Sequence, residues 1–407
     1  MKLPTLFAVL LCGALAGAGF AQEATKRGGR SKTGLDASDL PADARVLTIG
    51  DRAPDFSLPG IDGRTNTLND FKDAPLLLVV FLSNHCPYSH AAENRLLPLY
   101  AEMKSRGLAV VAINPNHPDA VRIDELGYSK YNDGYDEMKL YAKEKGFTFP
   151  YLYDGETQAT AKAYGCIATP HVFLFDRERK LRYAGRFDDS RLADPATVTS
   201  PDTRNAVEAL LAGKPVPVET TKVIGCSTKW LSKMGDVAEM DEQWKSLPVA
   251  LETIDAAGVA ALARNDTTKL RLVNVWATWC APCVKEFPGL VSLSRRLGNR
   301  DFELITISMD DPKEEAKAKA FLERQHAASP NRVQRSLKAE GRRTNNYLFK
   351  ETGTDALVKA LDPEWPGPLP HTVVIAPGGK IIYRKNGLVD FSELQSRLVD
   401  ELGPYYK

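Results

Sequence analysis

Short apolar runs alternate with amphipathic stretches along most of the chain. The run LLLVVFLS begins at residue 76, and apolar residues then recur at helical spacing up to about residue 105. Runs of about four to eight apolar residues are typical of buried strands, and recurrence every three or four residues is typical of amphipathic helices. The alternation predicts an α/β fold in which helices flank a mixed sheet.

The same order of elements is predicted in two parts of the chain. In the first part we expect strands at 77–82 and 108–113, helices at 88–105 and 135–145, a hairpin at 172–183 and a helix at 203–212. In the second part we expect strands at 272–276 and 302–308, helices at 281–297 and 313–327, a hairpin at 372–384 and a helix at 391–402.

Direct comparison of the two parts indicates an internal repeat. When Cys86 is aligned with Cys280, LLLVVFLSNHCPYSHAAENRL falls on LRLVNVWATWCAPCVKEFPGL. Further along, ATPHVFLFDRERKLRY falls on PLPHTVVIAPGGKIIY, so that Pro170 matches Pro370. Two matched blocks in the same order at nearly the same offset are the signature of a repeated unit. We therefore predict two tandem domains, a first module at 46–212 and a second module at 247–407, joined by a linker or arm at 213–246.

The first residues differ from the rest of the chain. Lys2 precedes a mostly apolar stretch, and Gly19-Phe20-Ala21 places small residues around a cleavage site. We interpret 1–21 as a secretory signal peptide, with an uncleaved anchor helix as the alternative, and 22–45 as a flexible leader. No later segment approaches the ~20 apolar residues of a membrane span. A periplasmic or secreted protein is expected.

Charge and composition exclude several classes of function. The chain has 407 residues, of which 53 are Lys or Arg and 52 are Asp or Glu, so its formal net charge is +1. This balance argues against a nucleic-acid-binding protein. The six His are scattered, and no His/Cys cluster has zinc spacing. We expect no metal and no organic cofactor.

The cysteines carry the candidate chemistry. Of the six, Cys12 lies in the apolar leader, and an exported protein uses the other five for bridges or for redox chemistry. Cys280 and Cys283 form a C-x-x-C pair where a strand run gives way to a helix. A thiolate at a helix N-terminus is stabilised, and a cysteine three residues later lies on the same face. C-x-x-C pairs also occur in zinc sites, but no second pair follows, so a redox dithiol is predicted.

The segment WATWCAPCVKEFP resembles the thioredoxin superfamily, and more closely its exported TlpA-like branch. The resemblance implies that Cys280 attacks and that Cys283 resolves the mixed disulfide. It also implies that Glu286 tunes thiol acidity and relays a proton, with a solvated helix residue as the alternative. Pro370 matches the cis-proline that packs against the disulfide and docks substrate. Asn274 departs from the pattern, because many thioredoxins carry a buried Asp there.

The first module resembles the redoxin or peroxiredoxin-like superfamily, through IGDRAPDFSLPGIDGRTNTLNDF, SNHCPYS, AINPN, TPHVFLFD and GRFDDS. Cys86 has the helix-start position of an activated thiolate, and the adjacent His85 could polarise it. Ser89 occupies the partner position, so no local disulfide can form. Peroxide attack also needs donors for the peroxide oxygens, for which Arg186 is the candidate. Val79 departs from the family's Pro at that position. A degenerate, buried Cys86 thiol is the alternative.

A sulfenic acid at Cys86 must be resolved by another thiol or be over-oxidised. Cys226 lies on the arm, in a Gly-Cys-Ser turn, and an arm that moves suits a resolving cysteine. Cys166 lies at a helix end and is expected to be structural. We predict a Cys86–Cys226 pair, with a permanent Cys166–Cys226 bridge as the alternative.

Together these features predict an exported thiol–disulfide oxidoreductase fused to a peroxiredoxin-like, antioxidant domain, which acts in cell-envelope redox homeostasis. The expected partners are thiol or disulfide client proteins, an upstream thiol reductant and peroxides. Two alternatives stay open. The first module could be inactive and recruit partners, or the protein could be a copper or cytochrome maturation chaperone.

Overall fold

The computed structural model describes residues 37–406. The predicted signal peptide and most of the predicted leader lie outside these residues. The end of that leader belongs to the fold, because Leu40 packs against a buried cluster of the first module and Arg45 N donates to Lys162 O at 2.9 Å.

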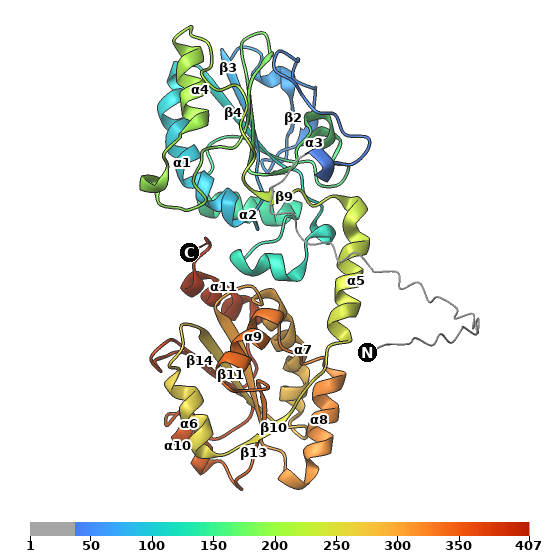
Figure 1. Ribbon diagram of the computed structural model, residues 1–407, viewed down its shortest axis with the longest axis vertical. Helices are drawn as coiled ribbons and strands as arrows, with labels where there is room; N and C mark the ends of the chain where they lie inside the picture. The colour runs from blue at the N-terminus through green and yellow to red at the C-terminus, as the bar shows by residue number, and fades with distance from the viewer. Residues whose placement is uncertain (1–36, 407) are drawn as a thin grey trace, which may run out of the picture. The chain divides into compact units, whose positions relative to one another are not determined.

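The first module contains a five-stranded mixed sheet (Figure 1). Its order is β5-β4-β3-β7-β8, in which β3, β4 and β5 are parallel and β7 and β8 are antiparallel to them. The strands are β3 (Leu76–Phe81), β4 (Leu108–Asn114), β5 (Tyr151–Tyr153), β7 (His171–Phe175) and β8 (Leu181–Gly185). All six residues of β3 are buried, as expected for a central strand covered on both faces.

Helices cover both faces of this sheet. They are α1 (Pro87–Met103), α2 (Tyr135–Lys145), α3 (Ala159–Tyr164) and α4 (Asp202–Leu211). Figure 1 shows α1 and α4 on one side of the sheet and α3 on the other. Successive residues of a strand point to opposite faces, so Leu78 packs with the α1 side and Leu77 with the α3 side.

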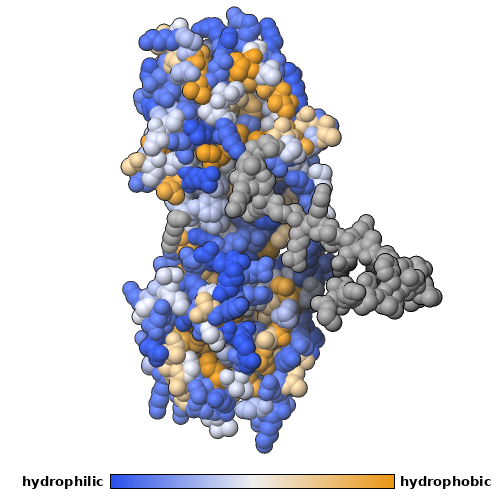
Figure 2. All heavy atoms as spheres, in the orientation of Figure 1, coloured by the Kyte–Doolittle hydropathy of each residue, from blue (hydrophilic) through white to orange (hydrophobic). Residues whose placement is uncertain are grey.

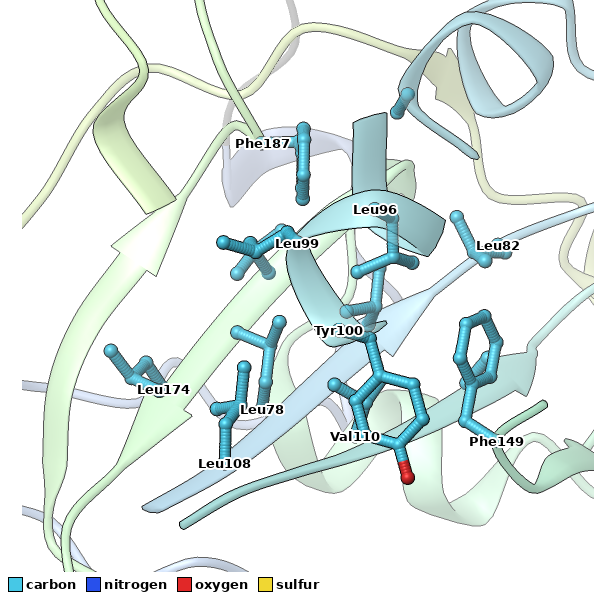
Figure 3. Close-up of a cluster of buried hydrophobic side chains, with 14 of the residues drawn as sticks. Leu78, Leu82, Leu96, Leu99, Tyr100, Leu108, Val110, Phe149, Leu174 and Phe187 are labelled. Atoms are coloured by element: carbon cyan, nitrogen blue, oxygen red, sulfur yellow. The ribbon is translucent and has the colours of Figure 1, made fainter. Parts of the chain in front are cut away.

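The core on the α1 side is shown in Figure 3, where Leu96 and Leu99 of α1 lie against strands that carry Leu78 and Val110. These four side chains have no more than 2% of their surface exposed. Burial of each such side chain contributes about 1.5–3 kcal/mol. This packing fixes α1, and with it Cys86 at the start of the helix.

The second module repeats the topology. Its sheet has the order β10-β13-β12-β11-β14-β15, with β10 added beside β13. The strands are β10 (Glu252–Ile254), β11 (Leu270–Trp276), β12 (Phe302–Ser308), β13 (Asn346–Phe349), β14 (His371–Ile375) and β15 (Ile381–Asn386). Strands β10 to β13 run parallel, and β14 and β15 form the antiparallel hairpin. The shared strand order confirms two copies of one thioredoxin-like module.

The helices of the second module also divide between two faces. Helices α7, α8 and α11 pack on one face, and α6 and α10 pack on the other (Figure 1). The helices are α6 (Ala256–Arg264), α7 (Ala281–Arg296), α8 (Glu315–Arg324), α9 (Asn331–Ala339), α10 (Asp355–Leu361) and α11 (Phe391–Leu402).

The arm between the modules contains regular structure that the sequence pattern did not indicate. It carries β9 (Cys226–Ser227) and α5 (Met234–Lys245). Strand β9 pairs with β6 (Ala168–Thr169), and a further hairpin joins β1 (Ser57–Pro59) to β2 (Thr65–Thr67).

Hydrophilic residues predominate on the face shown in Figure 2, with hydrophobic ones scattered between them. Among the helices of residues 37–406, none is long and apolar enough to cross a membrane.

Candidate functional site

The C-x-x-C pair lies at the junction of β11 and α7. Cys280 is the N-cap of α7, and its sulfur accepts a hydrogen bond from Cys283 N at 3.3 Å. The two cysteines are joined by a disulfide. Cys283 is fully buried, Cys280 is 6% exposed, and the neighbouring Trp279 is 62% exposed. Cys280 is therefore the less buried of the two cysteines, and it follows a large exposed side chain.

Glu286 lies one turn beyond Cys283 and is 4% exposed. Its two oxygens accept hydrogen bonds from Asn274 Nδ2 at 3.0 Å and from Val389 N at 3.1 Å. Burial raises the pKa of this carboxyl, although both hydrogen bonds act in the opposite direction. Glu286 is thus a buried carboxyl rather than a solvated helix residue, Asn274 is one of its donors, and its role in proton transfer stays a prediction.

The two matched prolines occupy equivalent places. The Leu369–Pro370 bond and the Thr169–Pro170 bond are both cis. Each proline directly precedes the strand that pairs with the central strand of its module, namely β14 or β7. The resemblance implied this arrangement for Pro370, and the repeat extends it to Pro170.

Cys86 is the N-cap of α1 and is fully buried. Its sulfur lies 3.0 Å from Thr169 O and 2.8 Å from the sulfur of Cys226. Cys226 reaches this position because it pairs with Thr169 across the β6–β9 ladder. Both cysteines are free thiols, and Cys226 is partly exposed. The structure therefore brings together the two cysteines that the sequence analysis favoured as partners.

The pKa values of Cys86 and Cys226 are shifted in opposite directions. Burial would raise the pKa of Cys86, but a hydrogen bond from Cys226 and the positive charge of His85 lower it to about 6. The hydrogen bond with Cys86 raises the pKa of Cys226 well above its ordinary value, and burial adds to this. These opposite shifts favour Cys86 as the thiolate of the pair and Cys226 as the thiol.

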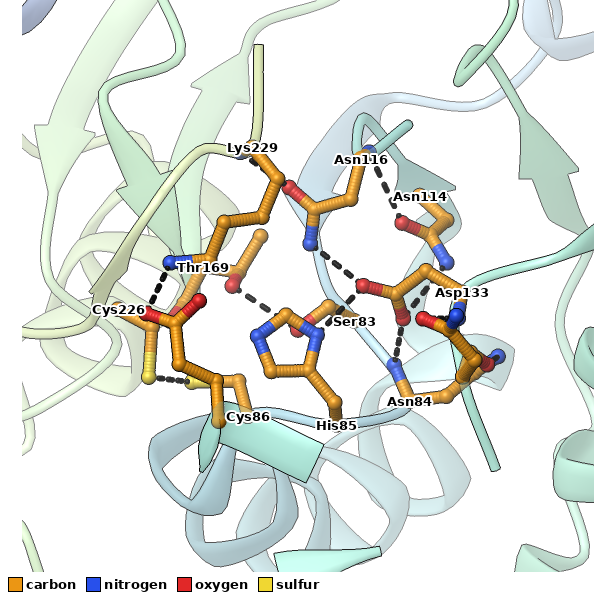
Figure 4. A network of polar contacts seen from close by, with 12 residues as sticks. Ser83, Asn84, His85, Cys86, Asn114, Asn116, Asp133, Thr169, Cys226 and Lys229 are labelled. Atoms are coloured by element: carbon orange, nitrogen blue, oxygen red, sulfur yellow. Dashed lines mark hydrogen bonds and ion pairs between the residues drawn. The ribbon is translucent and has the colours of Figure 1, made fainter. Parts of the chain in front are cut away.

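His85 links this pair to a buried polar network (Figure 4). Its Nδ1 lies 2.6 Å from Asp133 Oδ2, and Figure 4 shows Asp133 on one side of the ring and the two sulfurs on the other. Asp133 also accepts from Asn84 N, Asn116 Nδ2 and Asn114 Nδ2, at 2.7, 2.7 and 3.2 Å. These donors keep the carboxylate ionised inside the protein.

Each member of the dyad favours the charged form of the other. Burial lowers the pKa of His85, but the adjacent Asp133 carboxylate outweighs this and raises it. Burial likewise opposes ionisation of Asp133, and the charge of His85 lowers its pKa. Within the described residues, His85 Nε2 is buried without a hydrogen-bond partner. The dyad therefore places a positive charge and an available N–H beside Cys86.

Two further predicted residues lie in different surroundings. Cys166 is fully buried, its sulfur is 3.2 Å from Ala168 O, and burial raises its pKa to about 12. It is a buried free thiol, and its purely structural role stays a prediction. Arg186 Nε donates to Asp202 Oδ2 at 2.7 Å, and Arg186 N donates to Thr221 Oγ1 at 3.0 Å. These contacts hold Arg186 against α4, and its role toward peroxide stays a prediction.

Asp133 and the asparagines around it were not predicted from the sequence. AINPN was noted as part of a resemblance, and it supplies both Asn114 and Asn116. Asp133 comes from a separate loop, and only the fold brings it to His85. Within residues 37–406, no group of three or more His, Cys, Asp or Glu side chains is arranged to hold a metal ion.

Comparison with known proteins shows the same division into two. The sequence profile of the AhpC/TSA family matches residues 49–184 and again residues 257–384, together more than half of the chain. The chain belongs to the AhpC/TSA family. With its C-x-x-C disulfide, it is a two-module oxidoreductase of the thioredoxin superfamily.

Individual relatives cover less than half of the chain. The thiol-disulfide oxidoreductase ResA of Geobacillus thermodenitrificans (strain NG80-2) is 27% identical over 139 residues, which are 34% of this chain and 68% of ResA. The crystal structure of a hypothetical protein from Sinorhizobium meliloti 1021 is similar as well. The two sequences are 42% identical, the match covers 46% of this chain and 98% of that protein, and the TM-score is 0.41. The crystal structure of an uncharacterized conserved protein from Geobacillus kaustophilus shares 38% identity. The match covers 46% of this chain and 94% of that protein, with a TM-score of 0.41.

Proposed function

We propose that this protein is an exported thiol–disulfide oxidoreductase that acts in redox homeostasis of the cell envelope. The observation that carries this proposal is the Cys280–Cys283 disulfide at the start of α7, next to the exposed Trp279 and with a buried carboxyl one turn further along. The similarity to ResA, which is named as a thiol-disulfide oxidoreductase, supports it.

The reaction follows from the order of the two sulfurs. In the reduced protein, the Cys280 thiolate attacks a client disulfide, forms a mixed disulfide and releases one client thiolate. Cys283 then loses its proton, for which Glu286 is the acceptor, and attacks the Cys280 sulfur. This step closes the Cys280–Cys283 disulfide and releases the second client thiolate. Two electrons pass to the client, and an upstream dithiol protein restores the pair.

A second activity, reduction of peroxides, is favoured by the first module. Cys86 is a thiolate at neutral pH and has a second thiol 2.8 Å away. Its sulfur would attack one peroxide oxygen, the O–O bond would break, and the departing oxygen would take a proton from His85. The resulting sulfenic acid would condense with the Cys226 thiol to give a disulfide and water. With this activity, the first module would be an antioxidant domain.

Separate assays distinguish the two activities. With dithiothreitol as reductant, the chain should reduce a protein disulfide, Cys280→Ser should abolish this reaction, and Cys86→Ser should leave it unchanged. Peroxide consumption should be abolished by Cys86→Ser and left unchanged by Cys280→Ser. Disulfide reduction that survives Cys280→Ser would refute the proposed function.

A further inference from the structure

The segment that carries Cys226 is fastened to the first module on both sides of the cysteine. We call residues 219–231 the strap. At its beginning, Ala184 N donates to Glu219 O at 3.0 Å and Thr221 N donates to Ala184 O at 3.1 Å. At its end, Leu231 N donates to Gln158 Oε1 at 2.8 Å. The strap is therefore held as part of the module rather than hanging from it.

The middle of the strap lies against the edge that precedes Pro170. Thr169 pairs with Cys226 and Ala168 pairs with Ser227, in an antiparallel ladder. The approach is so close that a Cβ on Gly225 would lie 2.4 Å from Thr169 O. Only glycine fits at this distance, because real Cβ atoms do not come so near a carbonyl oxygen.

The part of the strap after Cys226 is anchored by buried groups. Lys229 Nζ lies 2.7 Å from Glu125 Oε1, and Lys229 N donates to Asn116 Oδ1 at 2.8 Å. Trp230 is 2% exposed and belongs to the hydrophobic cluster on the α3 side of the sheet. Release of the strap would break this largely buried salt bridge and expose the apolar surface of the tryptophan, and both changes cost free energy.

The second module lacks such a cover at the equivalent place. Leu369, which matches Thr169, is partly exposed and has no strand partner in the described part of the chain. Trp279 is 62% exposed, whereas His85, at the matching position before the first cysteine, is 1% exposed. The two copies of the module thus differ in whether the edge beside the reactive cysteine is free.

We propose that the strap is a resident internal ligand of the edge at Thr169, and that it closes Cys86 to the disulfides and dithiols of other proteins. An extended segment that pairs with this edge places a cysteine against Cys86. In this protein that segment is the strap, and the cysteine is Cys226. Thiol exchange with client proteins is thereby confined to the second module. Cys226, which is partly exposed, remains the sulfur of the first module that outside thiols can reach. This proposal deepens the proposed function, on which the redox role of Cys86 rests.

Labelling of Cys86 tests this shielding independently of any activity. In a chain carrying Cys226→Ser, Cys280→Ser and Cys283→Ser, labelling at Cys86 is followed by peptide mass mapping. The reagents are methyl methanethiosulfonate, which is small, and a maleimide on a long polyethylene glycol chain. Adding Gly225→Ala pushes the strap from the edge without altering a buried side chain. Gly235→Ala is the matched control, because a Cβ there meets nothing within 4 Å.

We expect the bulky maleimide to label Cys86 slowly in the parent and Gly235→Ala chains. Gly225→Ala should raise this rate about ten-fold or more, which corresponds to about 1.4 kcal/mol of lost strap binding. Equal rates in the parent and Gly225→Ala chains would overturn the proposal, whether both were fast or both were slow. Because the second module has no thiols in these chains, failure here is distinct from failure of the proposed function.

Discussion

Cys86 and Cys226 are 140 residues apart in the sequence, and their sulfur atoms lie 2.8 Å apart in the first module. A disulfide needs a separation of about 2.05 Å, so oxidation requires only a small movement of either side chain. The partner of Cys86 comes from the strap and not from the position three residues along the helix, which Ser89 occupies. The two modules therefore build their thiol pairs in different ways from one fold.

The acidity of Cys86 gives a testable pH dependence. Because its pKa is lowered to about 6, the thiolate form dominates above that pH and is lost below it. The rate at which a small alkylating reagent modifies Cys86 should therefore fall about ten-fold per pH unit below the midpoint. His85→Asn removes a positive charge and should move this midpoint upward. A midpoint that is the same in both chains would contradict the role assigned to His85. The measurement is alkylation in Cys280→Ser, Cys283→Ser chains, followed by peptide mapping.

The His85–Asp133 ion pair should stabilise the fold in a defined pH range. Asp133 has a lowered pKa, so its contribution is present above the unfolded value of about 3.9 and is lost as the pH falls through the folded value. His85 has a raised pKa, so its contribution is complete below about 6.5 and is lost as the pH rises through the folded value.

The coupling free energy between His85→Asn and Asp133→Asn should consequently be larger at pH 5 than at pH 9. Urea unfolding of the two single variants, the double variant and the parent measures it at each pH. Coupling that increases toward pH 9 would show that the pair is not charged in the folded protein.

Glu286 should matter to catalysis more than to stability. Glu286→Gln keeps an acceptor for Val389 N but removes the group that takes up the Cys283 proton. Loss of general acid–base catalysis costs roughly 10²-fold or more in rate, so client reduction should slow by about that factor. The exposed helix residue Glu323 offers a matched control, and Glu323→Gln should leave the rate unchanged. Equal rates for both variants would remove Glu286 from the mechanism.

Cys166 and Cys226 should respond differently to substitution. Cys166→Ala removes a fully buried thiol whose pKa is raised to about 12, and peroxide turnover should stay within about two-fold of the parent. Cys226→Ala removes the thiol beside Cys86, and Cys86 should then proceed to sulfinic acid. Mass spectrometry after peroxide treatment distinguishes these products. Over-oxidation of Cys86 in the Cys166→Ala chain alone would reverse the two assignments.

The long elements of the fold were predictable because their patterns are strong. Helices α2 and α11 have the predicted bounds, and β12 coincides with the predicted strand. The short strand β5 was missed, because three residues carry too little periodicity to stand out, and of α3 only the end beside Cys166 was expected.

The residues of the two sites also differ in how far they could be predicted from the sequence. Cys280, Cys283 and Glu286 lie within one segment, so local spacing places them together. The dyad of His85 and Asp133 spans 48 residues of sequence, and no local pattern joins them. The strap's contacts depend on β9 pairing with a two-residue strand, which tertiary packing selects and local sequence does not.

The most direct test of the account is the disulfide map of the fully reduced chain after it is oxidised by an equivalent of peroxide per thiol pair. The account predicts two bridges, Cys280–Cys283 and Cys86–Cys226, with Cys166 recovered as a free thiol. A Cys166–Cys226 bridge, with Cys86 free, would contradict it.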